Sequence, residues 1–117
     1  MEKQFVKSEI AKKLKEKGFN EPTMAYYNEK DEFVFTPYNN EDINLPNKVT
    51  KTENENNYSS APLWQQAIDW FYDNHEILIV QIPSYSMKVW EVSKKGNKDV
   101  ISGLSINKAI EEAIKLI

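Results

Sequence analysis

The second half of the chain alternates between the two periodicities of regular secondary structure, and this alternation constrains the fold most strongly. Over Ser60–His75 the apolar residues fall on one broad face at helical spacing, which predicts an amphipathic helix. The run Ile77–Ile82 is apolar on both sides of an extended chain, which is typical of a central, buried strand. Residues Ile106–Ile117 match the helical core pattern without a gap. These segments predict a packed domain and carry no pattern of reactive residues.

The residues between that strand and the last helix predict a further pair of strands. Met87–Val92 alternates from one side to the other, as a strand at a sheet surface does. Lys94–Lys98 has the composition of a turn, and Asp99–Ser102 follows it as a short third strand. Ser60 and Ser105 precede the two helices, where their side chains can accept hydrogen bonds from orphan backbone amides.

The N-terminal part of the chain predicts a helix followed by two strands. Apolar residues recur every fourth position within Phe5–Lys17, and Gly18 stands where a helix ends in the left-handed conformation. Thr23–Tyr27 and Glu32–Thr36 are rich in residues that favour strands and flank a polar turn. Phe19 follows the glycine, so we expect its ring to fold back onto the last helical turn.

An asparagine-rich stretch separates the two halves. Residues 39–59 hold seven asparagines and few apolar side chains, so they cannot bury enough surface to offset the entropy of ordering. We therefore expect a long surface loop at 39–59. The whole order of segments is αββαββα, which favours an α+β fold with one antiparallel sheet of four to five strands packed with three helices. With 117 residues, a single domain over 1–117 is expected.

Composition limits the classes of function. The chain has no cysteine, no apolar run near the roughly 20 residues of a membrane span, and no apolar signal segment at its start, so we expect a cytoplasmic protein that is not membrane-bound. All fifteen basic residues are lysine, whereas arginine is the side chain that forks onto phosphates and guanine edges. With a net charge of −3, nucleic-acid binding is an unlikely function.

The sequence offers no complete catalytic constellation. His75 is the only histidine, and its acidic neighbours in the sequence do not face it on a helix, so a role at the helix end is favoured. Asp69 and Asp73 share a helix face with glutamines and no histidine, which indicates a solvated surface. No glycine-rich phosphate loop or nucleophile elbow is present. We therefore expect no enzyme activity, no metal site and no cofactor.

Some of the aromatic side chains are candidates for a binding surface. Tyr26 and Tyr27 would point to opposite faces of their strand, and Tyr72 falls off the apolar face of its helix. Together with Tyr85, which lies in a turn, these tyrosines are candidates for an aromatic patch that anchors a partner. Scattered surface tyrosines are the alternative interpretation.

Three segments resemble small uncharacterised proteins of phages and prophages of Bacteroidetes. The segments are Ile10-Ala-x-x-Leu-Lys-Glu-Lys-Gly-Phe19, Ala61-Pro-Leu-Trp-Gln-Gln-Ala-Ile-Asp-Trp-Phe71 and Lys108-Ala-Ile-Glu-Glu-Ala-Ile-Lys-Leu-Ile117. The Ala-Pro-Leu-Trp-Gln-Gln segment is the most specific of them. The resemblance implies a phage-encoded origin; it implies no activity and assigns no catalytic residue.

Three functional hypotheses follow. The first is a non-catalytic accessory protein, derived from a phage or prophage, that acts by contact with an unknown protein partner or with itself. The alternative is a small ligand-binding protein or enzyme with a pocket between sheet and helices, in which Tyr26 or Tyr27, Asp69, His75 and Trp90 would line the cleft. The third and weakest is nucleic-acid binding by the lysines of the first helix, whose usual role is solubility: Lys12, Lys13, Lys15 and Lys17.

Overall fold

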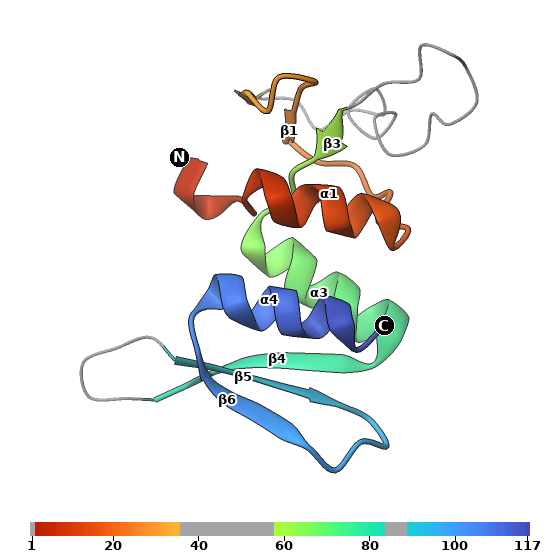
Figure 1. Ribbon diagram of the computed structural model, residues 1–117, viewed down its shortest axis with the longest axis vertical. Helices are drawn as coiled ribbons and strands as arrows, with labels where there is room; N and C mark the ends of the chain where they lie inside the picture. The colour runs from red at the N-terminus through yellow and green to blue at the C-terminus, as the bar shows by residue number, and fades with distance from the viewer. Residues whose placement is uncertain (1, 36–57, 84–88) are drawn as a thin grey trace. The chain divides into compact units, whose positions relative to one another are not determined.

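The computed structural model describes residues 2–35, 58–83 and 89–117 (Figure 1). The chain divides into two compact units, Met1–Trp64 and Gln65–Ile117, which are described one at a time. The expectation of one domain over the whole chain stays a prediction. Most of the predicted loop 39–59, and the predicted patch member Tyr85, lie outside the described residues.

The first unit combines the 3-10 turn η1 (Glu2–Gln4), the helix α1 (Ser8–Glu16) and a sheet with the strand order β2-β1-β3. The helix begins three residues later than expected. The reason lies in the preceding backbone, which is extended: Phe5 forms an antiparallel bridge with Leu63, and the amide of Val6 donates to the carbonyl of Pro62 over 3.0 Å. A residue engaged in such a ladder cannot also belong to a helix.

The end of α1 follows the prediction. Gly18 has a φ of +95°, in the left-handed region that favours glycine, and its amide donates to the carbonyl of Lys15. The amide of Phe19 donates to the carbonyl of Leu14 over 2.9 Å. The Phe19 side chain is fully buried, so it closes the last turn as the sequence indicates.

In the first sheet, β1 (Ala25–Tyr27) pairs antiparallel with β2 (Phe33–Phe35) on one edge and with β3 (Ser59–Ser60) on the other. Tyr27 lies opposite Phe33, whereas Tyr26 lies opposite Val34, so the two tyrosines occupy opposite faces as predicted. The prediction that Ser60 caps the second helix is wrong. Ser60 is buried in β3 opposite Tyr26, and the following helix begins at Trp64 instead.

The second unit contains most of α3 (Trp64–His75) and then an antiparallel meander of consecutive strands. These strands are followed by α4 (Ile106–Lys115), which packs on the sheet (Figure 1). The strands are β4 (Ile77–Ile82), β5 (Val89–Lys94) and β6 (Val100–Leu104). The third strand is confirmed and runs two residues further than the sequence suggests.

The last helix agrees closely with its prediction. The Ser105 hydroxyl accepts a hydrogen bond from the amide of Lys108 over 3.3 Å and so caps α4. The buried residues of the helix follow the predicted pattern: Ala109, Ile110, Ala113 and Ile114. In the described part of the chain, no helix has both the length and the apolarity that a membrane span requires.

The mixed α+β class is confirmed, but the single sheet of four to five strands is wrong. The structure has two three-stranded antiparallel sheets, with the orders β2-β1-β3 and β4-β5-β6. Both edges of β1 are occupied within the first unit, so β1 has no free edge to offer the later strands. The short strand β3 pairs with the second of these edges. It was not predicted, because it follows directly on the asparagine-rich stretch that was expected to be a loop.

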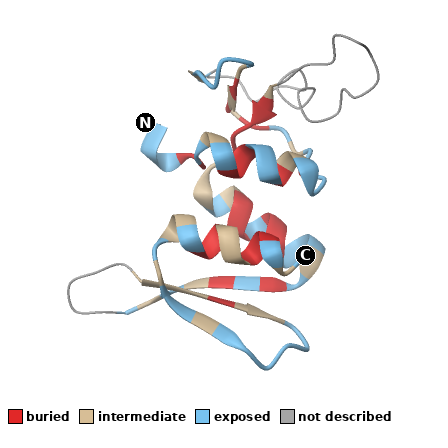
Figure 2. Ribbon diagram, viewed as in Figure 1, coloured by how far each residue is buried: buried red, intermediate tan, exposed pale blue. Residues whose placement is uncertain are grey.

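The prediction of a central, doubly buried strand at Ile77–Ile82 is also corrected. β4 stands at the end of its sheet rather than in the middle. Its burial alternates: Ile77 and Ile79 are buried, whereas Leu78 between them is exposed (Figure 2). The strand is apolar on both sides, although in its unit α4 packs on only one side of the sheet.

Candidate functional site

The predicted tyrosines do not behave alike. Tyr27 is buried, and its hydroxyl donates to the carbonyl of Val6 over 2.8 Å. Burial, with a smaller contribution from the carboxylate of Glu2, raises the pKa of the Tyr27 phenol. Tyr26 is half-buried on the other face, where its ring stacks on that of Tyr58 at 5.4 Å. Tyr27 is therefore a structural residue, and Tyr58 is an aromatic neighbour that sequence reasoning did not select.

Tyr72 is 58% exposed on α3, as its position on the helix predicts. It belongs to the second unit, whereas Tyr26 belongs to the first. Tyr26 and Tyr27 lie on opposite faces of β1 and Tyr85 lies outside the described residues, so the aromatic patch stays a prediction. Tyr26 and Tyr72 are the members that present exposed or half-exposed rings.

Of the residues predicted to line the alternative pocket, Asp69, His75 and Trp90 belong to the second unit, whereas Tyr26 and Tyr27 belong to the first. His75 contacts the ring of Trp70, with centroids 4.8 Å apart, at the end of α3. Burial first, and the charge of Lys94 second, lower the pKa of His75. The carboxylate of Asp69 accepts a hydrogen bond from the Gln65 side chain on the exposed side of the helix. His75 therefore packs against Trp70, and none of these contacts pairs it with an acid.

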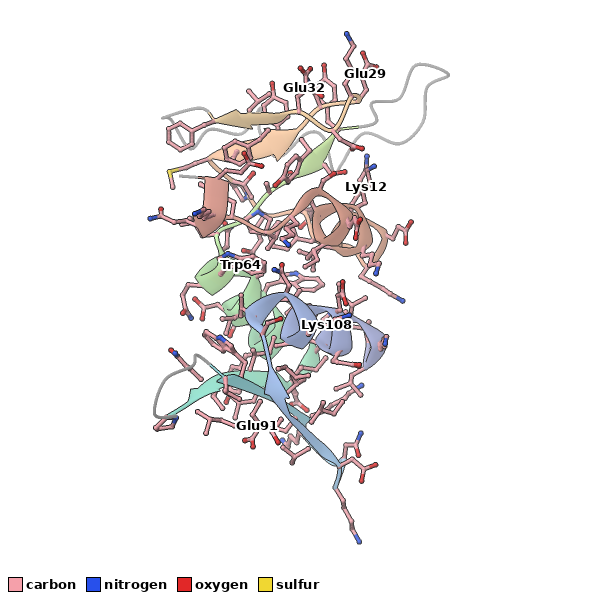
Figure 3. The ribbon with its side chains drawn as sticks, turned by 60° about the vertical axis from the view of Figure 1, so that its left-hand side comes forward. Lys12, Glu29, Glu32, Trp64, Glu91 and Lys108 are labelled. Carbon is pink, nitrogen blue, oxygen red and sulfur yellow. The ribbon has the colours of Figure 1, made fainter. Side chains whose placement is uncertain are left out.

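A polar cluster joins α1 to the turn after β1 in the first unit. One carboxylate oxygen of Asp31 lies 2.8 Å from Lys12 Nζ and accepts a hydrogen bond from Ser8 Oγ over 3.1 Å (Lys12 is labelled in Figure 3). The hydrogen bonds from Lys12 and Ser8 lower the pKa of Asp31. Asp31 has a φ of +62°, which is uncommon for a residue other than glycine. The cluster is exposed and anchors the turn to the helix.

The second sheet carries a more distinctive surface. Directly opposed residues of antiparallel strands share a face, so the register sorts the side chains into two sets. One set includes the buried Ile77, Ile79 and Val92, and also Lys94, whose Nζ donates to the carbonyl of Leu116 at the end of α4 over 2.6 Å. This is the face that α4 covers.

The opposite set forms what we call the outer face of the sheet. Its register pairs are Leu78 with Ser93, Val80 with Glu91, Ile82 with Val89, and Ser93 with Val100. Leu78 is 44% exposed and Val100 is 51% exposed, and the remaining members are of intermediate burial. Single exposed apolar residues are ordinary, but a contiguous apolar patch is typical of an interaction site.

Glu91 is the only charged residue among the described members of the outer face. It lies on the middle strand, directly opposite Val80. Figure 3 shows it on the side of the sheet away from Lys108 of α4. None of the ion pairs between described residues involves Glu91. The outer face therefore combines apolar side chains with a single carboxylate near its centre.

Sequence reasoning did not find this face, although the signal was present. A strand that is apolar on both sides requires cover on both sides, and the segments after Ile77–Ile82 supply only one helix. Reading the strand as buried assumed a second covering layer that the second unit does not itself provide. The strand has apolar residues for two sheet faces, but only one helix follows it, and this mismatch could have predicted an uncovered face.

In comparisons with known proteins, no protein-family description, no curated protein and no solved structure matches the chain. Within the described residues, no group of three or more histidine, aspartate or glutamate side chains is arranged to hold a metal ion. The outer face is therefore the feature of the described structure on which a functional proposal is best built.

Proposed function

We propose that this chain is a non-catalytic accessory protein of phage or prophage origin that acts by contact with another protein or with itself. The outer face of the second sheet is its contact surface. The phage origin is supported by the resemblance of three segments to small phage and prophage proteins of Bacteroidetes. The contact role rests on the structure of the second unit.

The observation that carries the proposal is the exposure of Leu78 and Val100 on a face that also holds Val80, Ile82 and Val89, with Ser93 between Leu78 and Val100. Leaving this surface in water forgoes about 25 cal/mol for each square ångström of apolar area. A covering protein would recover that free energy. Exposed apolar faces of this kind mark interaction sites more often than they mark ligand pockets, which are concave.

The proposal is tested by cross-linking from within the face. A photoreactive benzoylphenylalanine replaces Val100 in the protein expressed in its bacterial host, and irradiated cells are searched for covalent adducts. We expect an adduct with a discrete protein or with a second copy, and we expect Leu78→Lys to abolish it. The matched control places the same probe at Asp73, which is exposed on α3 and belongs to neither the outer face nor the predicted patch. Adduct-free protein at position 100, or an equal adduct pattern at both positions, would contradict the proposal.

A further inference from the structure

The outer face has the dimensions of one helix. Three strands spaced about 4.8 Å apart give a surface about 10 Å wide, and strands of five or six residues are about 17–20 Å long. An α-helix with its side chains is about 10–12 Å in diameter. The same sheet already shows this match, because its other face is covered by α4, a single ten-residue helix. A second helix of similar length would cover the outer face.

The apolar residues of the outer face determine which side chains a covering helix must place against it. Leu78, Val80 and Ile82 alternate along β4, and Val89 and Val100 continue the apolar surface on the other two strands. An apolar side chain from every third or fourth position of a helix would meet these residues. The α4 helix makes the equivalent contact on the covered face with its alanines and isoleucines, in the same spacing.

Glu91 adds a requirement of charge. A carboxylate covered by an apolar surface without a partner loses its hydration with no compensation, which is strongly unfavourable. Among the described residues the outer face supplies no cation, since the members other than Glu91 are apolar or serine. The occupant must therefore bring a basic side chain to the position opposite Glu91. Charge complementarity of this kind selects a partner more than it adds affinity.

A second copy of this chain does not meet the requirement. Two outer faces packed against each other would place two Glu91 carboxylates in one small apolar contact, and like charges in such a contact oppose association. No lysine among the described members of the face could offset them. Self-association through the outer face is thus disfavoured relative to a partner of opposite charge.

We propose that the outer face binds an amphipathic helix of another protein, whose apolar stripe carries one lysine or arginine that pairs with Glu91. This inference rests on the proposed contact function and narrows it to one class of partner. The surface is small compared with stable interfaces, which bury about 1,200–2,000 Å² in total. The complex therefore belongs to the weak, exchanging class.

The test begins with a display library of helical fourteen-residue peptides, selected on the purified full-length protein. Peptides that also bind the Leu78→Lys variant are removed, so that the survivors depend on the outer face. We expect the survivors to share apolar residues at helical spacing and one central lysine or arginine. The most enriched peptide is then synthesised with its basic residue intact and with that residue replaced by glutamate.

Fluorescence anisotropy measures the affinity of both synthetic peptides for three proteins: the natural chain, Glu91→Lys and the control Asp73→Lys, an exposed charge reversal on α3. For the basic peptide we expect Glu91→Lys to raise Kd at least about tenfold and Asp73→Lys to leave it unchanged. For the glutamate peptide the order reverses, with Glu91→Lys binding more tightly than the natural chain.

The other possible outcomes show whether the helical partner or the proposed contact function is wrong. Leu78-dependent peptides without a basic residue, or without sensitivity to Glu91→Lys, would overturn the charge-paired helix and leave the contact function standing. If no peptide is enriched and sedimentation shows a dimer that Leu78→Lys dissociates, the occupant is a second copy and the inference is wrong. If no peptide is enriched and the protein is monomeric, the inference is wrong, and the cross-linking from position 100 decides separately whether the contact function stands.

Discussion

The two sheets of this protein have the same number of strands but are built in different ways. The strands β2-β1-β3 have two or three residues each, and β3 joins from beyond residue 57. The strands β4-β5-β6 are consecutive in the chain and have five or six residues each. The first sheet depends on pairing across the sequence, whereas the second is a local meander.

The difference extends to what stabilises each sheet. In the first unit, polar side chains tie elements together through backbone carbonyls: Tyr27 Oη donates to Val6 O, and Lys15 Nζ donates to Tyr58 O, each over 2.8 Å. Aromatic contacts add to these, with Phe5 and Phe33 centroids 5.3 Å apart. In the second unit the strands carry more apolar side chains than α4 covers. In the short first sheet the strand β2 exposes Phe35 at its end, whereas the long second sheet exposes Leu78 and Val100 on the outer face.

The largest predicted effect compares the two cores directly. Phe19 in the first unit and Phe71 in the second are both fully buried, so replacement of either by alanine should cost about 3–5 kcal/mol of unfolding free energy. Urea unfolding followed by fluorescence and by circular dichroism measures the loss. If the chain is one cooperative domain, each substitution lowers the same single transition.

Two separate transitions, one lowered by Phe19→Ala alone and the other by Phe71→Ala alone, would contradict the single-domain prediction. Tyr72→Ala is the control, because its side chain is 58% exposed and should change stability by less than about 0.5 kcal/mol.

The next effect sharpens the account of anchoring in the first unit. Tyr27→Phe removes the hydroxyl that donates to the Val6 carbonyl and leaves that buried acceptor without its partner, which should cost about 1–3 kcal/mol. Tyr72→Phe, the same chemical change at an exposed position, should cost nothing measurable. Equal urea midpoints for the Tyr27→Phe and natural proteins would show that the anchor contributes nothing.

A smaller change should stabilise the second unit. Glu76 follows α3 with a φ of +54°, a left-handed conformation that glycine adopts without strain. Its side chain is exposed, and its ion pair with Lys95, at 3.7 Å, is of the surface type that contributes little. Glu76→Gly should therefore raise the unfolding free energy by about 0.5–1 kcal/mol. A lower melting temperature for this variant, beside an unchanged Glu76→Gln, would refute the assignment of strain to this residue.

The pH dependence of the second unit is the smallest effect. Because burial and Lys94 lower the pKa of His75, the neutral ring is favoured in the folded protein. The stability that this contributes is present above the ordinary pKa of about 6.5 and is lost as the pH falls through the lower folded value. His75→Gln should reduce the decline in urea midpoint between about pH 7 and pH 5. A decline of the same size in both proteins would assign it to other groups.

Local periodicity predicted the helices, the turn glycine and the alternation of side chains along individual strands. Gly18, Phe19 and Ser105 stand where their chemistry indicates, because a cap or a left-handed turn is decided by a few neighbouring residues. Tyr26 and Tyr27 point to opposite faces because a strand has a period of two. The mixed α+β class follows from these same local patterns.

Pairing between distant segments could not be predicted in the same way. Ser60 has the chemistry of a helix cap, but hydrogen bonding to β1 places it in a strand. The division into two sheets depends on which edges find partners, and no local pattern encodes that choice. The outer face could not be predicted for the same reason. Leu78 and Ile79 have similar side chains and differ only in which other segments cover them. The predicted patch of tyrosines stays a prediction for the same reason.

The central claim is that one face of the second sheet is left open, and single-cysteine labelling tests it most directly. The natural chain has no cysteine, so Leu78→Cys and Ile79→Cys each introduce a unique thiol on adjacent residues of β4. Reaction with a maleimide is followed by mass spectrometry in the folded protein and in urea. The account predicts that Cys at position 78 reacts nearly as fast in the folded protein as in urea, while Cys at 79 is strongly protected. Equal protection at both positions would show that the outer face is already covered within the protein and would contradict the account.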